Sequence, residues 1–261
     1  MQIGGYEVIG KLGEGAAGAV YRAVGPQGDV AVKVLRDADE VSRRRFEREA
    51  RIATGAASRH LVPILDVGDA FFVMPLYEQG SLAESISRDG ALPLPDVVRV
   101  AAELAQALDA LHALEIVHRD VKPSNVMLSG DGAMLADFGL ARGAGATQLT
   151  HDGQLVGSAH YLAPELIEGH PATPASDIYA LGCLLYECVT AAPPFTGRAD
   201  AELGYAHLVE APPDPRTRRQ GLADEVATAL LSALEKDPAT RPTSATALAR
   251  MLHLAGKPAP A

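Results

Sequence analysis

The chain has 261 residues, of which 48% are hydrophobic, and its formal net charge is −10. This length suits one large domain or two lobes that share a cleft, and the apolar content excludes a disordered chain. The negative charge argues against the basic surface with which proteins bind nucleic acids.

The N-terminal part of the chain has the pattern of a sheet with one helix. Alternating or β-branched residues between glycine-rich turns predict five strands. They cover residues 6–12, 19–25, 29–35, 61–69 and 70–77. In 42–56, apolar residues recur at helical spacing after Ser42, which predicts a helix with a serine cap.

Beyond residue 81 the apolar residues follow a helical period. A single apolar stripe predicts a helix over 95–114. Four more helices are predicted, at 175–191, 199–210, 223–236 and 244–255. Strands followed by helices indicate an α+β protein rather than a doubly wound sheet, with one part over 1–76 and the other over 77–255.

The sequence also bears on location. The N-terminal residues lack the basic start and long apolar stretch of a signal peptide, and no apolar run approaches the ~18 residues of a membrane helix. We therefore expect no membrane contact by this segment itself. Cys183 and Cys188 match no metal spacing and are interpreted as buried packing residues in a reducing cytoplasm. Residues 256–261 are rich in Pro and Ala, which is typical of a frayed tail or the start of a linker.

Three glycines, Gly13, Gly15 and Gly18, have G-x-G-x-x-G spacing. Small residues between them would let backbone amides approach a phosphate closely. In a dinucleotide site such glycines open a helix, whereas these lie between two strand patterns and predict a hairpin lid. No Gly-Lys-Ser/Thr follows, which excludes a Walker P-loop.

Lys33 interrupts an apolar strand. An ammonium is costly to bury unless it is paired, although a lysine at a strand edge can also extend its ammonium into solvent. Glu49 on the following helix is the expected partner, because it shares a helical face with the apolar Phe46 and Ala53. Glu47 is the alternative partner.

The stretch HRDVKPSN, residues 118–125, places four polar side chains of different character close together. Its last three residues are turn formers, so a solvated turn is the simpler interpretation. However, Asp137 follows a strand-like stretch shortly afterwards. Asn125 and Asp137 are expected at neighbouring strand ends, where their oxygens would suit Mg²⁺ beside substrate phosphates.

Five motifs, GEGAAGAV, VAVK, HRDVKPSN, DFG and APE, occur in the order and rough spacing of protein kinases. From Tyr6 to Leu254 the chain resembles the eukaryotic-type Ser/Thr kinases of bacteria, those of actinobacteria in particular. The resemblance implies a bilobal fold with an antiparallel-sheet N-lobe that carries one key helix, and a mainly helical C-lobe.

The resemblance implies a role for each residue of the catalytic loop. Asp120 would accept a hydrogen bond from the substrate hydroxyl, and Lys122 would neutralise the transferring phosphoryl group. Lys122 is also typical of the serine/threonine branch. Ser158 stands where that branch has a threonine, and its hydroxyl would bridge Asp120 and Lys122.

The nucleotide site follows from the same resemblance. Lys33, paired to Glu49, would hold the α- and β-phosphates of ATP beneath the glycine-rich lid. Asn125 and Asp137 would hold Mg²⁺, with Mn²⁺ as an alternative metal. Such positioning and charge compensation are what phosphoryl transfer needs.

The adenine pocket would be formed by the linker between the lobes. Met74 would be the gatekeeper. Pro75 lacks an N–H, but the family uses only the carbonyl there, and Tyr77 would supply the N–H. The apolar walls around the base would be formed by Leu12, Val20, Ala31 and Met127. For these four residues, ordinary core packing is the alternative.

The family also implies a phosphorylation switch. Arg119 would bind a phosphate on the polar, glycine-rich segment 141–157. Thr147 and Thr150 are the candidate sites, and Thr150 is favoured by its distance before GSAHYLAPE. The alternative is that the two threonines belong to an ordinary solvated loop and carry no phosphate.

Three residues would serve as scaffold by the same resemblance. Glu165 of APE would form a buried ion pair with Arg241, and Asp177 would accept backbone N–H groups from the catalytic loop. His118 is interpreted as a packed core histidine, not a base.

The leading hypothesis is a Ser/Thr protein kinase with ATP and Mg²⁺ as cofactors, protein substrates, and activation-loop autophosphorylation in trans within a homodimer. It would be cytoplasmic, or the cytosolic domain of a longer membrane-anchored protein. A pseudokinase scaffold is the alternative, but it predicts loss of at least one of four residues, and all four are present: Lys33, Asp120, Asn125 and Asp137. Small-molecule phosphotransferases generally lack the APE platform.

Overall fold

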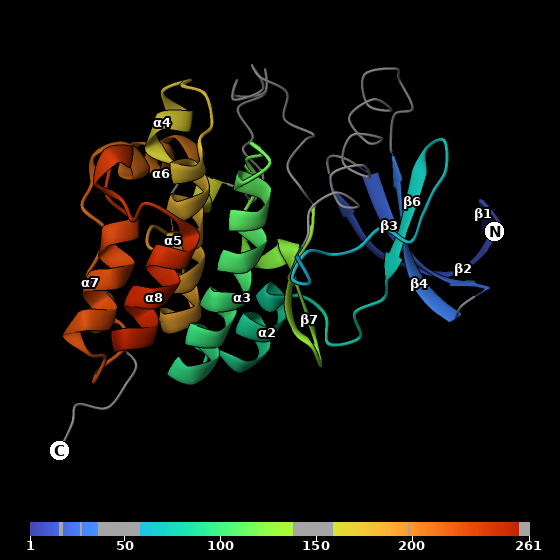
Figure 1. Ribbon diagram of the computed structural model, residues 1–261, viewed down its shortest axis with the longest axis horizontal. Coiled ribbons are helices and arrows are strands. Elements are labelled where there is room, and N and C mark those ends of the chain that lie inside the picture. Colours follow the sequence, from blue (N-terminus) through green and yellow to red (C-terminus); the bar gives the residue numbers. More distant parts are fainter. Residues whose placement is uncertain (16–17, 27, 36–57, 138–158, 198, 256–261) are drawn as a thin grey trace.

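The computed structural model describes residues 1–15, 18–26, 28–35, 58–137, 159–197 and 199–255. Figure 1 shows a strand-rich part and a helix-rich part side by side, with the β7–β8 ribbon at their junction. The segregation of strands and helices expected from the sequence is confirmed. The predicted helix over 42–56, with Glu49 and Glu47, lies outside the described residues, as does the 256–261 tail.

The N-terminal part is one antiparallel sheet of six strands in the order β1-β2-β3-β4-β6-β5. The strands are β1 (Gln2–Ile3), β2 (Tyr6–Gly15), β3 (Gly18–Gly25), β4 (Gly28–Leu35), β5 (Asp66–Val67) and β6 (Phe71–Pro75). Hairpin β2–β3 pairs Gly15 with Gly18, which confirms strands rather than a helix around the glycines. A Cβ at Gly18 would lie 1.9 Å from the carbonyl oxygen of Val34, so the close strand packing requires a glycine there.

The strand predicted over 61–69 is mostly wrong, because only Asp66–Val67 is paired as a strand. Pro63 interrupts the ladder, since it has no N–H to donate. Instead, Leu61 forms a parallel bridge with Leu135, and the N–H of Val62 donates to the carbonyl of Leu135 over 2.9 Å. This segment therefore ties the sheet to the helical part.

The C-terminal part is mainly helical and carries the two-stranded ribbon β7–β8. Its helices are α2 (Leu82–Asp89), α3 (Leu94–His112), α4 (Pro164–Ile167), α5 (Pro174–Thr190), α6 (Asp200–Val209), α7 (Asp224–Ala233) and α8 (Ala245–Ala255). The ribbon consists of β7 (Val126–Ser129) and β8 (Gly132–Leu135). Short 3₁₀ helices cover Pro123–Asn125, Ala159–Tyr161, Pro215–Thr217 and Pro238–Thr240.

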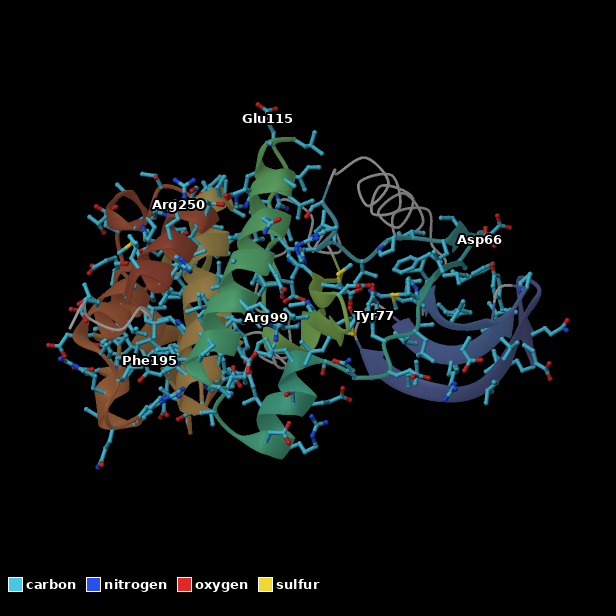
Figure 2. The ribbon with its side chains drawn as sticks, turned by 60° about the horizontal axis from the view of Figure 1, so that its bottom comes forward. Asp66, Tyr77, Arg99, Glu115, Phe195 and Arg250 are labelled. Carbon is cyan, nitrogen blue, oxygen red and sulfur yellow. The ribbon has the colours of Figure 1, made fainter. Side chains whose placement is uncertain are left out.

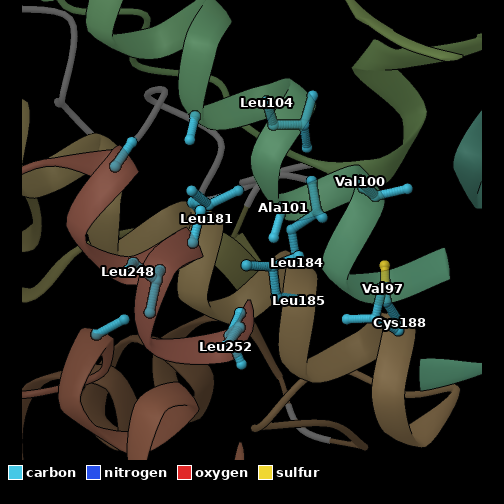
Figure 3. Packing of buried hydrophobic residues seen from close by; sticks show 14 of the residues in the cluster. Val97, Val100, Ala101, Leu104, Leu181, Leu184, Leu185, Cys188, Leu248 and Leu252 are labelled. Atoms are coloured by element: carbon cyan, nitrogen blue, oxygen red, sulfur yellow. The ribbon is translucent and has the colours of Figure 1, made fainter. Parts of the chain in front are cut away.

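The core of the helical part lies between α3, α5, α7 and α8. Figure 3 shows Ala101 and Leu104 of α3 beside Leu184 of α5 and Leu248 of α8. The predicted apolar stripe of α3 is fully buried, and fully burying such a leucine contributes ~1.5–3 kcal/mol. This core supports the loop 118–125, which follows α3 after residues 113–117.

Helix α2 starts with a capping box that the sequence analysis did not identify. Ser81 accepts a hydrogen bond from the N–H of Glu84 over 3.2 Å, and the Glu84 carboxylate accepts one from the N–H of Ser81 over 2.7 Å. Ser81 is buried and also forms a β-bridge with Met127. The cap therefore fixes the start of α2 against the ribbon.

We expect Ser81→Ala to lower the free energy of unfolding by about 1 kcal/mol, the usual contribution of a serine N-cap. Urea denaturation followed by circular dichroism measures this difference. Ser85→Ala in the same helix is the matched control, because Ser85 makes only an exposed contact of 3.5 Å with Asp89. Equal losses in the two variants would contradict the capping role.

A buried polar cluster lies under α6. The Tyr179 hydroxyl and Nδ1 of His207 share a hydrogen bond of 2.8 Å, and Phe195 packs edge-on against the imidazole. Lys236 lies 4.9 Å from the Phe195 ring centroid and donates to the carbonyl of His207 over 2.7 Å. Burial, helped by the Lys236 charge, lowers the pKa of His207 to about 3, so this imidazole is neutral in the folded protein.

The low pKa of His207 makes stability depend on pH. The unfolded chain protonates this histidine near pH 6.5, whereas the folded one does so near pH 3, so stability falls as the pH drops through this window. In His207→Phe the free energy of unfolding should fall less steeply below pH 6.5, by up to about 1.4 kcal/mol per pH unit. Urea denaturation at several pH values measures the slopes. His253→Phe, at an exposed histidine of α8, should leave the slope unchanged; parallel slopes for wild type and His207→Phe would refute the assignment.

Candidate active site

The candidate site lies where residues 76–80, the linker between the two parts, pass the β7–β8 ribbon. The N–H of Leu128 in β7 donates to the carbonyl of Gly80 at the end of the linker over 2.9 Å. Gly80 is followed by Ser81, the N-cap of α2. The bond from Leu128 therefore holds the linker and the start of α2 against the ribbon. Figure 2 shows Tyr77 of the linker at this junction.

Asp177 of α5 organises the loop 118–125. Its carboxylate accepts hydrogen bonds from the backbone N–H groups of His118 and Arg119, each over 2.8 Å, and from Nε2 of His112 over 2.8 Å. Arg119 has a φ of 69°, a left-handed conformation that is uncommon for this residue type. The two N–H bonds to a fully buried carboxylate hold the backbone in this conformation.

His118 is fully buried and positions its neighbour. Its Nε2 donates to the carbonyl of Ala136 over 3.1 Å, while its Nδ1 accepts from the N–H of Asp120 over 3.3 Å. Burial lowers the pKa of His118, which agrees with this neutral tautomer. The contacts suit a packed histidine and not a general base.

Asp120, Lys122 and Asn125 form one cluster. The ammonium of Lys122 lies 2.8 Å from Oδ2 of Asp120, and Nδ2 of Asn125 donates to the same oxygen over 2.9 Å and to the Asp120 carbonyl over 2.8 Å. About one fifth of the Asp120 and Lys122 side chains is exposed, 21% and 19%, so a substrate hydroxyl can reach them. The turn formers at 123–125 form a 3₁₀ helix that shapes this cluster.

Asn125 and Asp137 lie at adjacent strand ends, as the sequence analysis expected. Asn125 precedes β7, Asp137 follows β8, and the N–H of Ala136 donates to the carbonyl of Asn125 over 2.8 Å. The amide nitrogen of Asn125 is engaged by Asp120, which leaves its Oδ1 to face another ligand. An amide oxygen beside a half-exposed carboxylate is a donor set that fits Mg²⁺.

Lys33 forms an ion pair with Asp137. It lies in the interior of the sheet, since β4 is flanked by β3 and β6, and only 11% of its side chain is exposed. The expectation of a paired lysine therefore holds over that of a solvated edge lysine, and Asp137 is the partner found among the described residues. Glu49, the partner expected from the sequence, falls outside them.

The residues expected around the adenine line the junction on its sheet side. Ala31 pairs with Met74 across β4 and β6, and Ala31 is buried at 5% exposure. Leu12 on the glycine-rich hairpin is 53% exposed, which excludes core packing for this residue. It lines a cavity of about 600 Å³ together with Tyr77 of the linker.

The remaining pocket residues occupy the same junction. Val20 pairs with Lys33 across β3 and β4, Pro75 ends β6 opposite Val30, and Met127 pairs with Met134 in the ribbon. Gly13 pairs with Val20 within the hairpin. The residues expected around the nucleotide thus belong to the glycine-rich hairpin, the neighbouring strands, the linker and the ribbon.

Tyr77 is half-buried in the linker. Burial, with a smaller contribution from the charge of Asp131, raises the pKa of its phenol to about 12. The phenol therefore stays protonated over the physiological range. Its backbone carbonyl accepts from the N–H of Gly80 over 3.0 Å, which turns the chain toward α2.

Glu165 and Arg241 form a buried bidentate ion pair. The two terminal nitrogens of Arg241 donate to the two carboxylate oxygens over 2.9 and 2.8 Å, and Ser176 donates to Glu165 over 2.7 Å. Burial alone would raise the pKa of Glu165, but the bonds from Arg241 and Ser176 outweigh it and hold the pKa below its usual value. The Arg241 guanidinium also stacks 4.9 Å from the ring centroid of Tyr179.

The site contains one contact that the sequence did not predict, and three of the predicted residues lie outside the described ranges. The contact of His112 with Asp177 was not predicted, because 65 positions separate the two residues and no local pattern relates them. Thr147, Thr150 and Ser158 lie outside the described residues. Arg119, the expected ligand of a phosphate on Thr147 or Thr150, is held at its backbone N–H by Asp177.

Comparison with known proteins agrees with this geometry. The protein kinase domain family matches residues 6–252 of the chain. In fold, the chain resembles the crystal structure of Rad53 1-466 in complex with AMP-PNP, with a TM-score of 0.77 and 24% identity over 94% of this chain and 64% of that one.

Two bacterial proteins are similar to most of this chain. The chain is 38% identical to the serine/threonine-protein kinase PknH of Mycobacterium tuberculosis, over 96% of this chain and 42% of the relative. It is 36% identical to PknB of Mycobacterium leprae, over 90% of this chain and 40% of the relative. The chain thus spans less than half the length of these relatives, and no described helix is long and apolar enough to cross a bilayer. With a family match along nearly its whole length, the chain belongs to the protein kinase family, and the relatives that it resembles are serine/threonine kinases of bacteria.

Proposed function

We propose that this chain transfers the γ-phosphate of ATP to serine or threonine hydroxyls of proteins. The observation that supports this most directly is the cluster of Asp120, Lys122 and Asn125, which lies next to Asp137 and Lys33. The family uses ATP and a divalent metal, and its members act on proteins. Lys122 favours serine and threonine as acceptors.

In the proposed mechanism Asp120 accepts the hydrogen bond of the substrate hydroxyl and takes its proton as the oxygen attacks the γ-phosphorus. The bond from the γ-phosphorus to the bridging oxygen breaks, and ADP leaves. Lys122, 2.8 Å from Asp120, compensates the charge that develops on the transferring phosphoryl group.

Nucleotide binding would rearrange the pair of Lys33 and Asp137. The phosphate oxygens would bind the ammonium of Lys33, and the Asp137 carboxylate would then be released from its ion pair. Asn125 and Asp137 would then hold the metal, Mg²⁺ by preference and Mn²⁺ as the alternative, and the metal would neutralise phosphate charge. Glu49 would steady Lys33 from the helix.

The remaining assignments are part of the same proposal. The sheet part over 1–76 and the helical part over 77–255 would act as the two lobes around the nucleotide. Glu165, Asp177 and Arg241 would act as the scaffold. The domain would work in the cytoplasm, alone or as part of a longer membrane-anchored protein, and pairs of chains would phosphorylate each other. The pseudokinase alternative is disfavoured, since Lys33, Asp120, Asn125 and Asp137 are all present.

The switch residues give a direct test. After incubation with ATP and Mg²⁺, we expect phosphate on Thr150, with Thr147 as the second site, because Arg119 beside Asp120 offers a guanidinium for it. Phosphopeptide mass spectrometry locates the sites, and a parallel incubation with Mn²⁺ compares the metals. Asp120→Asn should remain unmodified when incubated alone.

Mixing the unmodified Asp120→Asn protein with active wild type tests the homodimer. Phosphate on the variant would support transfer between chains. Wild-type chains that bind ATP yet gain no phosphate on any residue would favour the scaffold alternative instead.

A further inference from the structure

A cavity of about 690 Å³ lies beside the linker and is distinct from the cavity of about 600 Å³ that Leu12 lines. The two cavities share linker residues 76–79. The cavity at Leu12 is completed by α2, whereas the larger one is completed by Arg59 and the 128–131 turn of the ribbon. We call the larger one the linker cavity. It contains Pro75 and Tyr77 of the residues proposed to bind the nucleotide, and it contains no member of the cluster of Asp120, Lys122 and Asn125.

Within the described ranges, Arg59 at the rim of the linker cavity is held through its Nε. Its Nε donates to Nε2 of the buried His60 over 3.1 Å, and Nδ1 of His60 donates to the carbonyl of Ala133 over 3.1 Å. No acceptor among the described residues contacts the two terminal amino groups of Arg59. An arginine oriented in this way offers a fork for a carboxylate.

The rest of the linker cavity combines apolar and charged groups. Leu76, Leu128 and Met134 are half-buried and form an apolar floor. Glu78 and Asp131 at the rim are exposed, and neither forms an ion pair within the described part of the chain. An apolar centre with a charged, exposed rim is the anatomy of a protein interface, whereas small-molecule sites enclose their polar groups.

We propose that the linker cavity docks an extended segment of a partner protein. An apolar side chain of the segment would lie on the floor, an acidic residue would bind the Arg59 fork, and a basic residue would face Asp131 or Glu78. Charges of both signs on the rim would fix the direction of the segment, since the reversed segment would place like charges together.

The docked segment would also influence the nucleotide. Arg59 belongs to the segment that ties the sheet to β8, and Asp131 belongs to the ribbon turn, so a segment bound to both would hold this connection beside the linker. Tyr77, whose phenol is half-buried beside Asp131, lines both cavities. Docking should therefore change the affinity for ATP. This coupling rests on the proposed function, whereas the docking itself does not.

The test selects peptides without nucleotide. Random 12-residue peptides on phage are selected on the whole chain, and binders are labelled with fluorescein for anisotropy titration. We expect the selected peptides to share an acidic residue near apolar ones, and their Kd to rise at least tenfold with Arg59→Glu and with Met134→Lys. Arg250→Glu, at an exposed arginine of α8, is the matched control and should leave Kd unchanged. Melting temperatures verify that each variant is folded.

Charge reversal makes the test specific. A peptide whose acidic residue is replaced by lysine should bind Arg59→Glu better than wild type. The docking proposal is wrong if no selected peptide depends on Arg59 and Met134. It is also wrong if a dipeptide such as acetyl-Leu-Glu competes as well as the whole peptide, because the cavity would then be a small-molecule site.

The coupling has its own readout. Addition of the peptide at saturation should shift the Kd of a fluorescent ATP analogue at least threefold in wild type and not in Arg59→Glu. An unchanged Kd would contradict the coupling. A chain that docks peptides but transfers no phosphate would contradict the proposed function alone.

Discussion

Asp120→Asn is expected to lower kcat for phosphoryl transfer by ~10²–10⁴-fold, the usual contribution of a general base. Asparagine has the same shape and can keep a contact with Lys122 and Asn125, so the fold and the affinity for ATP should change little. A kinase assay with a peptide substrate measures kcat, and titration with a fluorescent ATP analogue measures Kd.

The controls separate proton transfer from phosphate binding. Lys33→Met should weaken ATP binding as well as lower kcat, because the ammonium over the phosphates is lost. Asp69→Asn, at an exposed aspartate before β6, should leave both constants unchanged. An Asp120→Asn protein with wild-type kcat would remove Asp120 from the mechanism.

Arg241→Met is expected to lower the free energy of unfolding by ~3–5 kcal/mol, the usual cost of removing one partner of a buried ion pair. Glu165 would keep its hydrogen bond to Ser176 but lose both bonds from the guanidinium, in a site where it is 6% exposed. Arg241 also donates to the carbonyls of Ala175, Glu235 and Lys236, and these three bonds would be lost as well. Urea denaturation at pH 7 measures the difference.

The double variant Arg241→Met, Glu165→Met tests the cause. If the loss comes from an uncompensated buried carboxylate, the double variant should recover a large part of the stability. Arg250→Met, at an exposed arginine, should cost little. A single variant as stable as wild type would show that the ion pair contributes nothing to the fold.

Long periodic segments were predictable from the sequence, and short ones were not. The stripe of α3 predicted residues 95–114, and the helix covers Leu94–His112. Helix α4 has four residues, too few for any period to show. The start of α2 has a signal in the sequence as well, since Ser81 followed by Glu84 is the pattern of a capping box.

The features of the site were likewise predictable where they belong to a local motif, and not where they join distant residues. The order of the motifs indicates the family and its chemistry, because each motif is local. Contacts between distant residues are set by packing, so the pair of Lys33 with Asp137, 104 positions apart, and the contact of His112 with Asp177 appeared only in the structure. The strand over 61–69 failed for a local reason, since Pro63 outweighs the β-branched residues around it.

The burial of the two cysteines has a practical consequence. Cys183 and Cys188 are the only cysteines of the sequence, and burial raises the pKa of both thiols, so neither forms the thiolate that reacts with maleimides. A cysteine introduced on the exposed surface of each part would therefore be labelled selectively in the otherwise natural chain. Energy transfer between two such dyes would report opening and closing of the molecule in solution.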